Sequence, residues 1–438
     1  MDHVLVTLGR NPLPVAVAVS RLFELYKGSQ FTLLASTFRD IDRLVEAVQT
    51  KHPNFKCQSD TIIDYTDPNF IWEKATQFAA AHKEEQVHFH YTGGTKPMIL
   101  HMKSALDAGL NQPPSVSYIA ADQHYLEICS RTNGGALKVE KLVPDERLHF
   151  KLNLDQLSRL HGFSRNFTVS NRHGRYSVGT GSRVGGFLPK QRTVGDAAWL
   201  RLAQEIFSLR SNNAGDQALN PVLDAFDKVL PRDFSNLPNR ESCPPISWPA
   251  ALNTKIPDQM NLLLGKEVWD NNRTFQATVL RSDVELEQVA RWFKGDWLED
   301  LVFDRFDKAL PTVSKSLGVR FAQIDPLHPA APVQKDFELD VAVVLGYQLI
   351  AVSCYAGKSA HTAKMKGFEA LHRAQQLGGS EALSILVSLL GDDDADDLAE
   401  ELNGAAKTFN TRFHIWNRRN VSNLNQKITE LLNSISYD

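Results

Sequence analysis

The first 150 residues alternate short apolar runs with amphipathic segments, and this alternation constrains the fold more than any other feature of the chain. The runs that predict strands, and the helically spaced segments between them, lie at 4–8, 15–26, 31–35, 41–49, 87–91, 97–110 and 116–120. Strand–helix repeats of this length favour a parallel sheet with right-handed crossovers. We therefore predict an α/β domain over residues 1–150.

The rest of the chain is long enough for further domains, since 438 residues suit two or three. From residue 281 to 438 the predicted order is helix, strand, strand, helix and strand, which describes a second compact α/β domain. Residues 151–280 are predicted to be a linker or insertion. Seven prolines fall between Pro221 and Pro257, and they predict irregular structure there.

A basic segment lies within this middle stretch. Residues 156–195 contain seven Lys or Arg and no Asp or Glu. Such a segment suits the backbone of a nucleic acid, with aromatic rings available for stacking, or it is a basic loop without a partner. The pattern favours neither alternative. Over the whole chain 48 basic residues balance 51 acidic ones, so any contact with nucleic acid must come from a local patch.

Composition also bears on the compartment. No apolar run of about 18 residues occurs, so no membrane span is predicted. The chain enters a strand-like run at once, unlike a signal peptide. The four cysteines form no CxxC pair, which argues against a disulfide framework and a structural zinc site and fits the cytoplasm. His88 and His90 share one face of a predicted strand, and without a third ligand we expect a packed or exposed pair.

Glycines and polar side chains follow three strands of the first predicted sheet. In an open parallel sheet, ligands bind beyond the carboxyl ends of the strands. Gly93 and Gly94 let the backbone approach a ligand, and the helix starting near Pro97 points its N–H groups at an anion. The alternative is a tight turn, since neither a P-loop nor GxGxxG is present. The candidate binding residues are Gly9, Arg10, Asn11, Pro12, Ser36, Thr37, Thr92, Gly93, Gly94, Thr95 and Lys96.

The segments 6–12 and 91–98 resemble the CARF domain, the CRISPR-associated Rossmann fold. The resemblance covers residues 1–150 and implies a Rossmann-like sensor of the cyclic oligoadenylates made by type III CRISPR complexes. It further implies a homodimer that binds one cyclic ligand across its two-fold axis through the candidate residues above. Cyclic tetra-adenylate is the commonest ligand of similar proteins, while the ring size stays open here.

Three carboxylates alternate along a predicted strand near residue 340. Asp336, Glu338 and Asp340 are spaced at i, i+2 and i+4, which places them on one face of a strand. An acidic row that runs into an apolar core strand is costly unless a cation balances it, and a divalent metal takes oxygen ligands. A helix carrying Glu299 could bring a further carboxylate. The alternative is an edge strand with a solvated acidic face.

Residues 285–390 resemble the PD-(D/E)xK restriction-endonuclease-like fold that is fused to CARF domains in CRISPR ancillary nucleases. The matching segments are 295–299, 338–341 and 371–379 with the strand 383–388. The resemblance implies that Asp340, with Glu299 and Glu338, binds Mg²⁺ or Mn²⁺ and is catalytic.

One departure concerns the next strand, where the family has Glu/Asp-x-Lys. This chain has Ser353 and Tyr355 in those positions. Lys358 is the candidate replacement for the lysine, and Lys364 and Lys366 lie further along.

Together the two resemblances imply a cyclic-oligoadenylate-activated, metal-dependent endonuclease of type III CRISPR antiviral defence that acts on DNA or RNA. The alternative is a sensor whose impaired nuclease-like domain binds nucleic acid or a protein partner. A further possibility is that the N-terminal domain degrades its own ligand.

Overall fold

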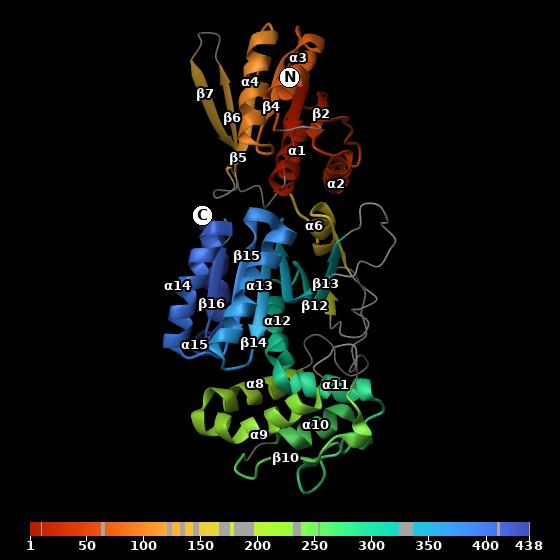
Figure 1. Cartoon of the computed structure of the whole chain (residues 1–438), viewed down its shortest axis with the longest axis vertical. Coiled ribbons are helices and arrows are strands. Elements are labelled where there is room, and N and C mark those ends of the chain that lie inside the picture. The colour runs from red at the N-terminus through yellow and green to blue at the C-terminus, as the bar shows by residue number, and fades with distance from the viewer. Residues whose placement is uncertain are drawn as a thin grey trace.

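A computed structural model of the chain describes residues 1–9, 11–62, 66–120, 125–131, 136–142, 149–165, 176–178, 197–230, 238–252, 255–323, 336–409 and 412–437. Three parts follow one another along the long axis: an N-terminal α/β part, a C-terminal α/β part in the middle, and a helical part (Figure 1). Within these ranges no helix has the length and apolar character needed to cross a membrane.

The N-terminal part is built on a seven-stranded sheet of order β3-β2-β1-β4-β5-β6-β7. Its first five strands in sequence run parallel, as the strand–helix alternation predicts, and the last two add an antiparallel edge. The strands are β1 His3–Thr7, β2 Gln30–Ala35, β3 Gln58–Thr61, β4 Val87–His90, β5 Ser115–Ala120, β6 Tyr125–Arg131 and β7 Leu137–Leu142.

Helices cover both faces of this sheet because alternate side chains of its central strand are apolar on both sides. Val4 and Val6 pack with α1 and α2, whereas Leu5 packs with α3 and α4. The helices are α1 Leu13–Leu25, α2 Phe38–Gln49, α3 Pro68–Ala81 and α4 Lys96–Gly109.

The middle part is built on a mixed sheet of order β16-β15-β14-β13-β12-β8, and β9 also pairs with β12. The strands β8 and β9 come from the basic segment, so two of its pieces are antiparallel partners of β12. The elements are β8 Phe163–Arg165, β9 Tyr176–Val178, α12 Trp297–Ala309, β12 Ser314–Gln323, β13 Asp336–Leu345, β14 Gln348–Tyr355, α13 Ala360–Gly378, β15 Leu383–Ser388, α14 Asp392–Phe409, β16 Arg412–Trp416, α15 Arg418–Ser422 and α16 Leu424–Tyr437.

The helical part contains α8 Ala197–Ser211, α9 Asn213–Val229, α10 Ile256–Leu264 and α11 Asp283–Arg291, with a short hairpin of β10 Ile246–Ser247 and β11 Thr274–Phe275. Pro221 lies inside α9, so the expectation of irregular structure is wrong for this helix. An aromatic cluster forms the core, in which the rings of Phe226 and Phe293 stack at 4.6 Å. Burial of these rings outweighs the hydrogen bond that proline cannot donate.

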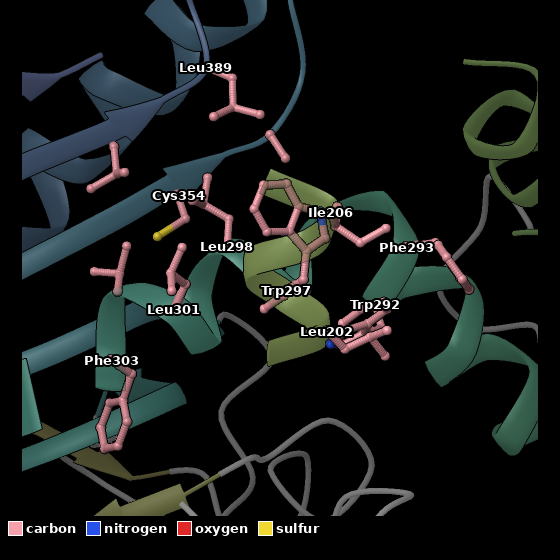
Figure 2. Packing of buried hydrophobic residues seen from close by; sticks show 14 of the residues in the cluster. Leu202, Ile206, Trp292, Phe293, Trp297, Leu298, Leu301, Phe303, Cys354 and Leu389 are labelled. Carbon is pink, nitrogen blue, oxygen red and sulfur yellow. The ribbon is translucent and has the colours of Figure 1, made fainter. Parts of the chain in front are cut away.

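A kinked segment, Trp292–Asp296, in which Gly295 leaves the helical conformation, joins α11 to α12 and so connects the helical part to the middle sheet. Figure 2 shows the consequence: Trp297, Leu298 and Leu301 of α12 pack between α8 and the buried Cys354 of β14. The apolar face of α12 is thereby fixed beneath the sheet.

A short helix, α6 Leu154–Leu160, joins the N-terminal and middle parts. Leu157 and Leu160 belong to one apolar cluster with Leu44 of α2 and Leu349 of β14. The core is therefore continuous across this junction. The division of the chain into domains at 1–150, 151–280 and 281–438 stays a prediction.

Candidate ligand pocket and nuclease site

Two loops meet tightly at the carboxyl edge of the N-terminal sheet, which faces the middle part (Figure 1). The hydroxyl of Thr7 donates to the carbonyl of Gly93 over 2.7 Å. A Cβ atom added to Gly93 would lie 2.3 Å from the carbonyl oxygen of Thr7, and one on Gly9 would lie 2.7 Å from the amide nitrogen of Gly94. These approaches require glycine, so Gly9 and Gly93 allow the two loops to meet and shape this edge.

A cavity of about 560 Å³ opens beside these loops. Its volume is that of a small-molecule site. Five of the predicted binding residues line it: Gly9, Pro12, Ser36, Gly94 and Thr95. The structure thus brings together residues from three strand ends, as expected for a parallel sheet.

Other predicted binding residues lie around the cavity in different roles. Asn11 points toward the middle part, where its Nδ2 donates to Ser380 Oγ over 3.1 Å and to Glu381 Oε2 over 2.9 Å. Thr37 caps α2 by accepting from the amide of Asp40. The hydroxyl of Thr92 accepts a hydrogen bond from the amide of Ile119 over 2.6 Å. Lys96 is exposed at the start of α4, and Arg10 lies outside the described residues.

The cavity also contains residues that the sequence did not identify. Asp40 and Arg43 reach it from α2, and His161 reaches it from the end of α6. Gly162, with φ of 85°, leaves room for the guanidinium of Arg43, which would lie 2.7 Å from an added Cβ. Desolvation by burial lowers the pKa of His161 to about 4, so its imidazole is neutral at physiological pH. No local motif marks these positions, because α6 is brought to the cavity only by tertiary packing.

Asp340 lies where the pairing of β13 changes. Its Oδ2 accepts from the amide of Cys354 over 2.7 Å and from the hydroxyl of Ser353 over 3.3 Å. The ladder to β14 begins only at Val341, and Gly318 of β12, with φ of 56°, interrupts the register opposite Asp340. These contacts hold the carboxylate toward the end of β14.

The alternation of side chains along β13 slips by one residue at Asp340. Leu339 and Ala342 pack in the same apolar cluster, although an unbroken strand would place them on opposite faces. Glu338 is therefore not grouped with Asp340, and its Oε2 instead accepts from Arg320 Nε of the neighbouring strand over 3.2 Å. The expectation that the three carboxylates share one face is wrong for Glu338. The side chain of Asp336 lies outside the described residues.

The three candidate lysines have three different partners. Lys358 forms an ion pair with the buried Asp216 of α9, and Lys364 forms one with Glu401 of α14. Lys366, on the second turn of α13, lies 3.9 Å from Asp340 Oδ2. The structure thus brings Lys366, rather than Lys358, to Asp340. Tyr355, which the resemblance to PD-(D/E)xK proteins aligns with their lysine, packs in the apolar cluster beneath α13.

Glu299 completes this group from the first turn of α12, where it is 9% exposed. The negative charge of Asp340, and secondarily that of Glu299, raises the pKa of Lys366 above its ordinary value. Lys366 is consequently a permanent cation at neutral pH. The site gathers Asp340, Glu299 and Lys366 from a strand and two helices, and its two carboxylates offer the oxygen atoms that Mg²⁺ or Mn²⁺ prefers.

Comparison with solved structures shows the same architecture elsewhere. Can2 from Sulfobacillus thermosulfidooxidans, solved in complex with cyclic tetra-adenylate, has a TM-score of 0.59 and 13% identity, covering 98% of this chain and 99% of that chain. Protein VC1899 from Vibrio cholerae has a TM-score of 0.57 and 16% identity, covering 98% and 97%. A type III CRISPR defence DNA nuclease activated by cyclic oligoadenylate has a lower TM-score of 0.44 and 13% identity, covering 89% of this chain and 46% of that chain.

No family model and no curated protein matches the sequence. At 13% and 16% identity, structural likeness shows the fold alone. The α/β class predicted from the sequence is confirmed, and the chain has the fold of Can2 and VC1899 over nearly its whole length.

Proposed function

We propose that the protein is a metal-dependent endonuclease of type III CRISPR defence that a cyclic oligoadenylate switches on. This proposal rests on one observation: the same chain has a cavity at the edge of the N-terminal sheet and, separately, the group of Asp340, Glu299 and Lys366 in the middle part. The fold shared with Can2, which was solved with cyclic tetra-adenylate, supports the choice of ligand.

The cavity suits one part of a cyclic oligoadenylate. Arg43 supplies a cation for a phosphate, the N-terminus of α4 supplies N–H groups, and Met98 offers apolar surface to a base. A cyclic tetra-adenylate has two-fold symmetry, so two copies of the cavity related by a dyad can bind equivalent halves. The proposal therefore includes a homodimer.

A divalent metal bound by Asp340 and Glu299 would supply an activated water and neutralise charge at the scissile phosphate. Lys366 would stabilise the negative charge that develops on that phosphate, and its raised pKa rules it out as the base at neutral pH. The amide of Cys354 and the hydroxyl of Ser353 orient the carboxylate of Asp340. Either DNA or RNA can present such a phosphate.

The cavity has a physical connection to the catalytic group. Asn11 follows the strand end that lines the cavity, and its amide contacts Ser380 and Glu381 just beyond α13. Glu381 is 3% exposed, and its backbone carbonyl also accepts from Gln348 of β14 over 2.8 Å. Because α13 also carries Lys366, a ligand that moves the Asn11 loop acts on the helix that holds the catalytic lysine.

The second candidate function is a sensor without cleavage, and the replacement of the family carboxylate by Ser353 favours it. The two are separated by incubating the protein with cyclic tetra-adenylate, Mn²⁺, plasmid DNA and single-stranded RNA. We expect ligand binding together with cleavage of at least one substrate. Binding without cleavage supports the sensor, and loss of the intact ligand by the wild type would show that the protein degrades it.

A further inference from the structure

The amino edge of the N-terminal sheet, opposite the cavity, holds two histidines and a glutamate close together. His3 begins β1, and His82 and Glu85 lie at and just after the end of α3. One nitrogen of each histidine and one oxygen of Glu85 all lie within 4.8 Å of one another. Among the described residues this is the one group in which three such ligand atoms gather.

The two distances from Glu85 to the histidines are close to the edges of a metal coordination tetrahedron. His82 Nδ1 lies 3.0 Å and His3 Nδ1 lies 3.5 Å from Glu85 Oε2. Zinc binds imidazole nitrogen and carboxylate oxygen at about 2.0–2.2 Å, which places two ligand atoms of a tetrahedron about 3.4 Å apart. Glu85 and either histidine are therefore spaced to share one ion, and the ligand atoms of the two histidines lie within 4.8 Å of each other.

His3 is held in the orientation that a ligand needs. Its side chain is fully buried, and its Nε2 lies 2.8 Å from the hydroxyl of Thr32. When Nε2–H donates to this hydroxyl, the lone pair of Nδ1 faces Glu85. Nδ1 has no hydrogen-bond partner among the described residues. The imidazole and the carboxylate then face each other as two acceptors, of which His3 is fully buried, and this arrangement favours a cation between them. A hydrogen-bond partner behind the imidazole is a typical outer support of a metal ligand.

Two features distinguish this group from other buried histidines and from a simple ion pair. His88 of the same sheet has hydroxyls on both ring nitrogens, at 2.7 Å from Ser115 and 2.7 Å from Ser117, and needs no ion. The loop that carries Glu85 is also preorganised, because the carbonyl of Gln86 accepts from the amides of Asp2 and His3. The ligands are thus fixed by the backbone of β1 as well as by α3.

We propose that His3, His82 and Glu85 form a metal site for Zn²⁺ or a similar borderline divalent cation, with water completing the coordination. Glu85 and His82 are partly exposed, with side-chain exposures of 38% and 16%, so the fourth position is open to solvent. The site ties the start of β1 to the end of α3. It lies at the edge remote from the cavity, and it is independent of the proposed nuclease activity.

The test uses the full chain, first stripped with a chelator and then titrated with Zn²⁺ by calorimetry and with Co²⁺ by visible absorption. A site with two nitrogen ligands and one oxygen ligand gives the intense visible bands of tetrahedral Co²⁺ with one equivalent per chain. We expect Glu85→Gln and His82→Ala to weaken binding at least tenfold and to remove these bands. The neighbouring exposed Glu84→Gln is the matched control and should bind as the wild type does.

Two further measurements keep the result unambiguous. Asp340→Asn should retain the Co²⁺ bands, which separates this site from the nuclease site. Bound Zn²⁺ should raise the melting temperature of the wild type and of Glu84→Gln but not that of Glu85→Gln, since a ligand stabilises the folded state that binds it. Equal affinity of Glu84→Gln and Glu85→Gln, or octahedral Co²⁺ spectra in the wild type, would overturn the proposal.

Discussion

The pocket at the N-terminal sheet and the carboxylate site of the middle sheet are built in different ways. The pocket is formed by strand ends, and five predicted residues line it. The carboxylate site is formed by side chains from β13, α12 and α13, and the predicted carboxylates Asp340 and Glu299 are those whose negative charge acts on Lys366. A site at strand ends depends on local pattern, whereas a site between elements depends on how the helices pack.

The largest effect should come from the carboxylate that the structure holds most firmly. Asp340→Asn removes a metal ligand and should reduce cleavage by roughly 1,000-fold, because metal catalysis supplies several kcal/mol. Binding of cyclic tetra-adenylate should not change. Glu338→Gln is the matched comparison: its carboxylate pairs with Arg320, so its cleavage rate should stay near that of the wild type. Cleavage rates of both variants are measured on a labelled substrate. An equal loss of rate in the two variants would show that Glu338 acts together with Asp340, as the sequence predicted.

The next effect separates the lysines. Lys366→Met should slow cleavage roughly 100-fold, the loss typical of one removed charge-stabilising donor. Lys358→Met should leave cleavage close to the wild-type rate and lower thermal stability instead, because Lys358 pairs with the buried Asp216. Rates and melting temperatures are measured on both variants. The opposite ranking of the two cleavage rates would show that Lys358 reaches the phosphate.

In the pocket, the glycine contact is the most sensitive point. Gly93→Ala places a Cβ 2.3 Å from the carbonyl of Thr7 and should cost about 1–3 kcal/mol through forced backbone movement. Ligand affinity should fall, as measured by calorimetry. Gly391→Ala is the control, since an added Cβ there meets no atom within 4 Å. Unchanged ligand affinity in Gly93→Ala would show that the close contact between residue 93 and the carbonyl of Thr7 is not needed to form the pocket.

The smallest effect concerns pH. His161 is neutral above its pKa of about 4, so between pH 6 and pH 8 its titration adds no charge to the pocket. The guanidinium of Arg43, whose Nη1 lies 3.8 Å from Asp40 Oδ1, remains a cation in this range. Ligand affinity should therefore be nearly flat from pH 6 to pH 8. Affinity that rises steeply toward pH 6 would show that the bound ligand draws a proton onto His161.

The sequence predicted β1, β2, β4 and β5 of the first sheet and the edge where their carboxyl ends meet, because each of these strands is a short apolar run. The polar β3 and the exposed β7 have no such run. It missed Arg43 and His161 because they enter the pocket from α2 and α6, whose placement depends on tertiary packing. It grouped Glu338 with Asp340 because strict alternation was assumed, and the break opposite Gly318 has no pattern of its own. The sequence favoured Lys358 because it follows Tyr355 by only three residues. In the structure, α13 instead places Lys366 3.9 Å from Asp340.

The contact between the two regions gives the most direct test of the proposed function. The measurement is the ratio of cleavage rates with and without cyclic tetra-adenylate, in the wild type and in Asn11→Ala, whose side chain joins the pocket loop to Glu381. The wild type should cleave only when the ligand is present. In Asn11→Ala the ratio should fall at least about fivefold, because a coupling of 1–3 kcal/mol is lost. A wild type that cleaves equally with and without the ligand would contradict the proposal.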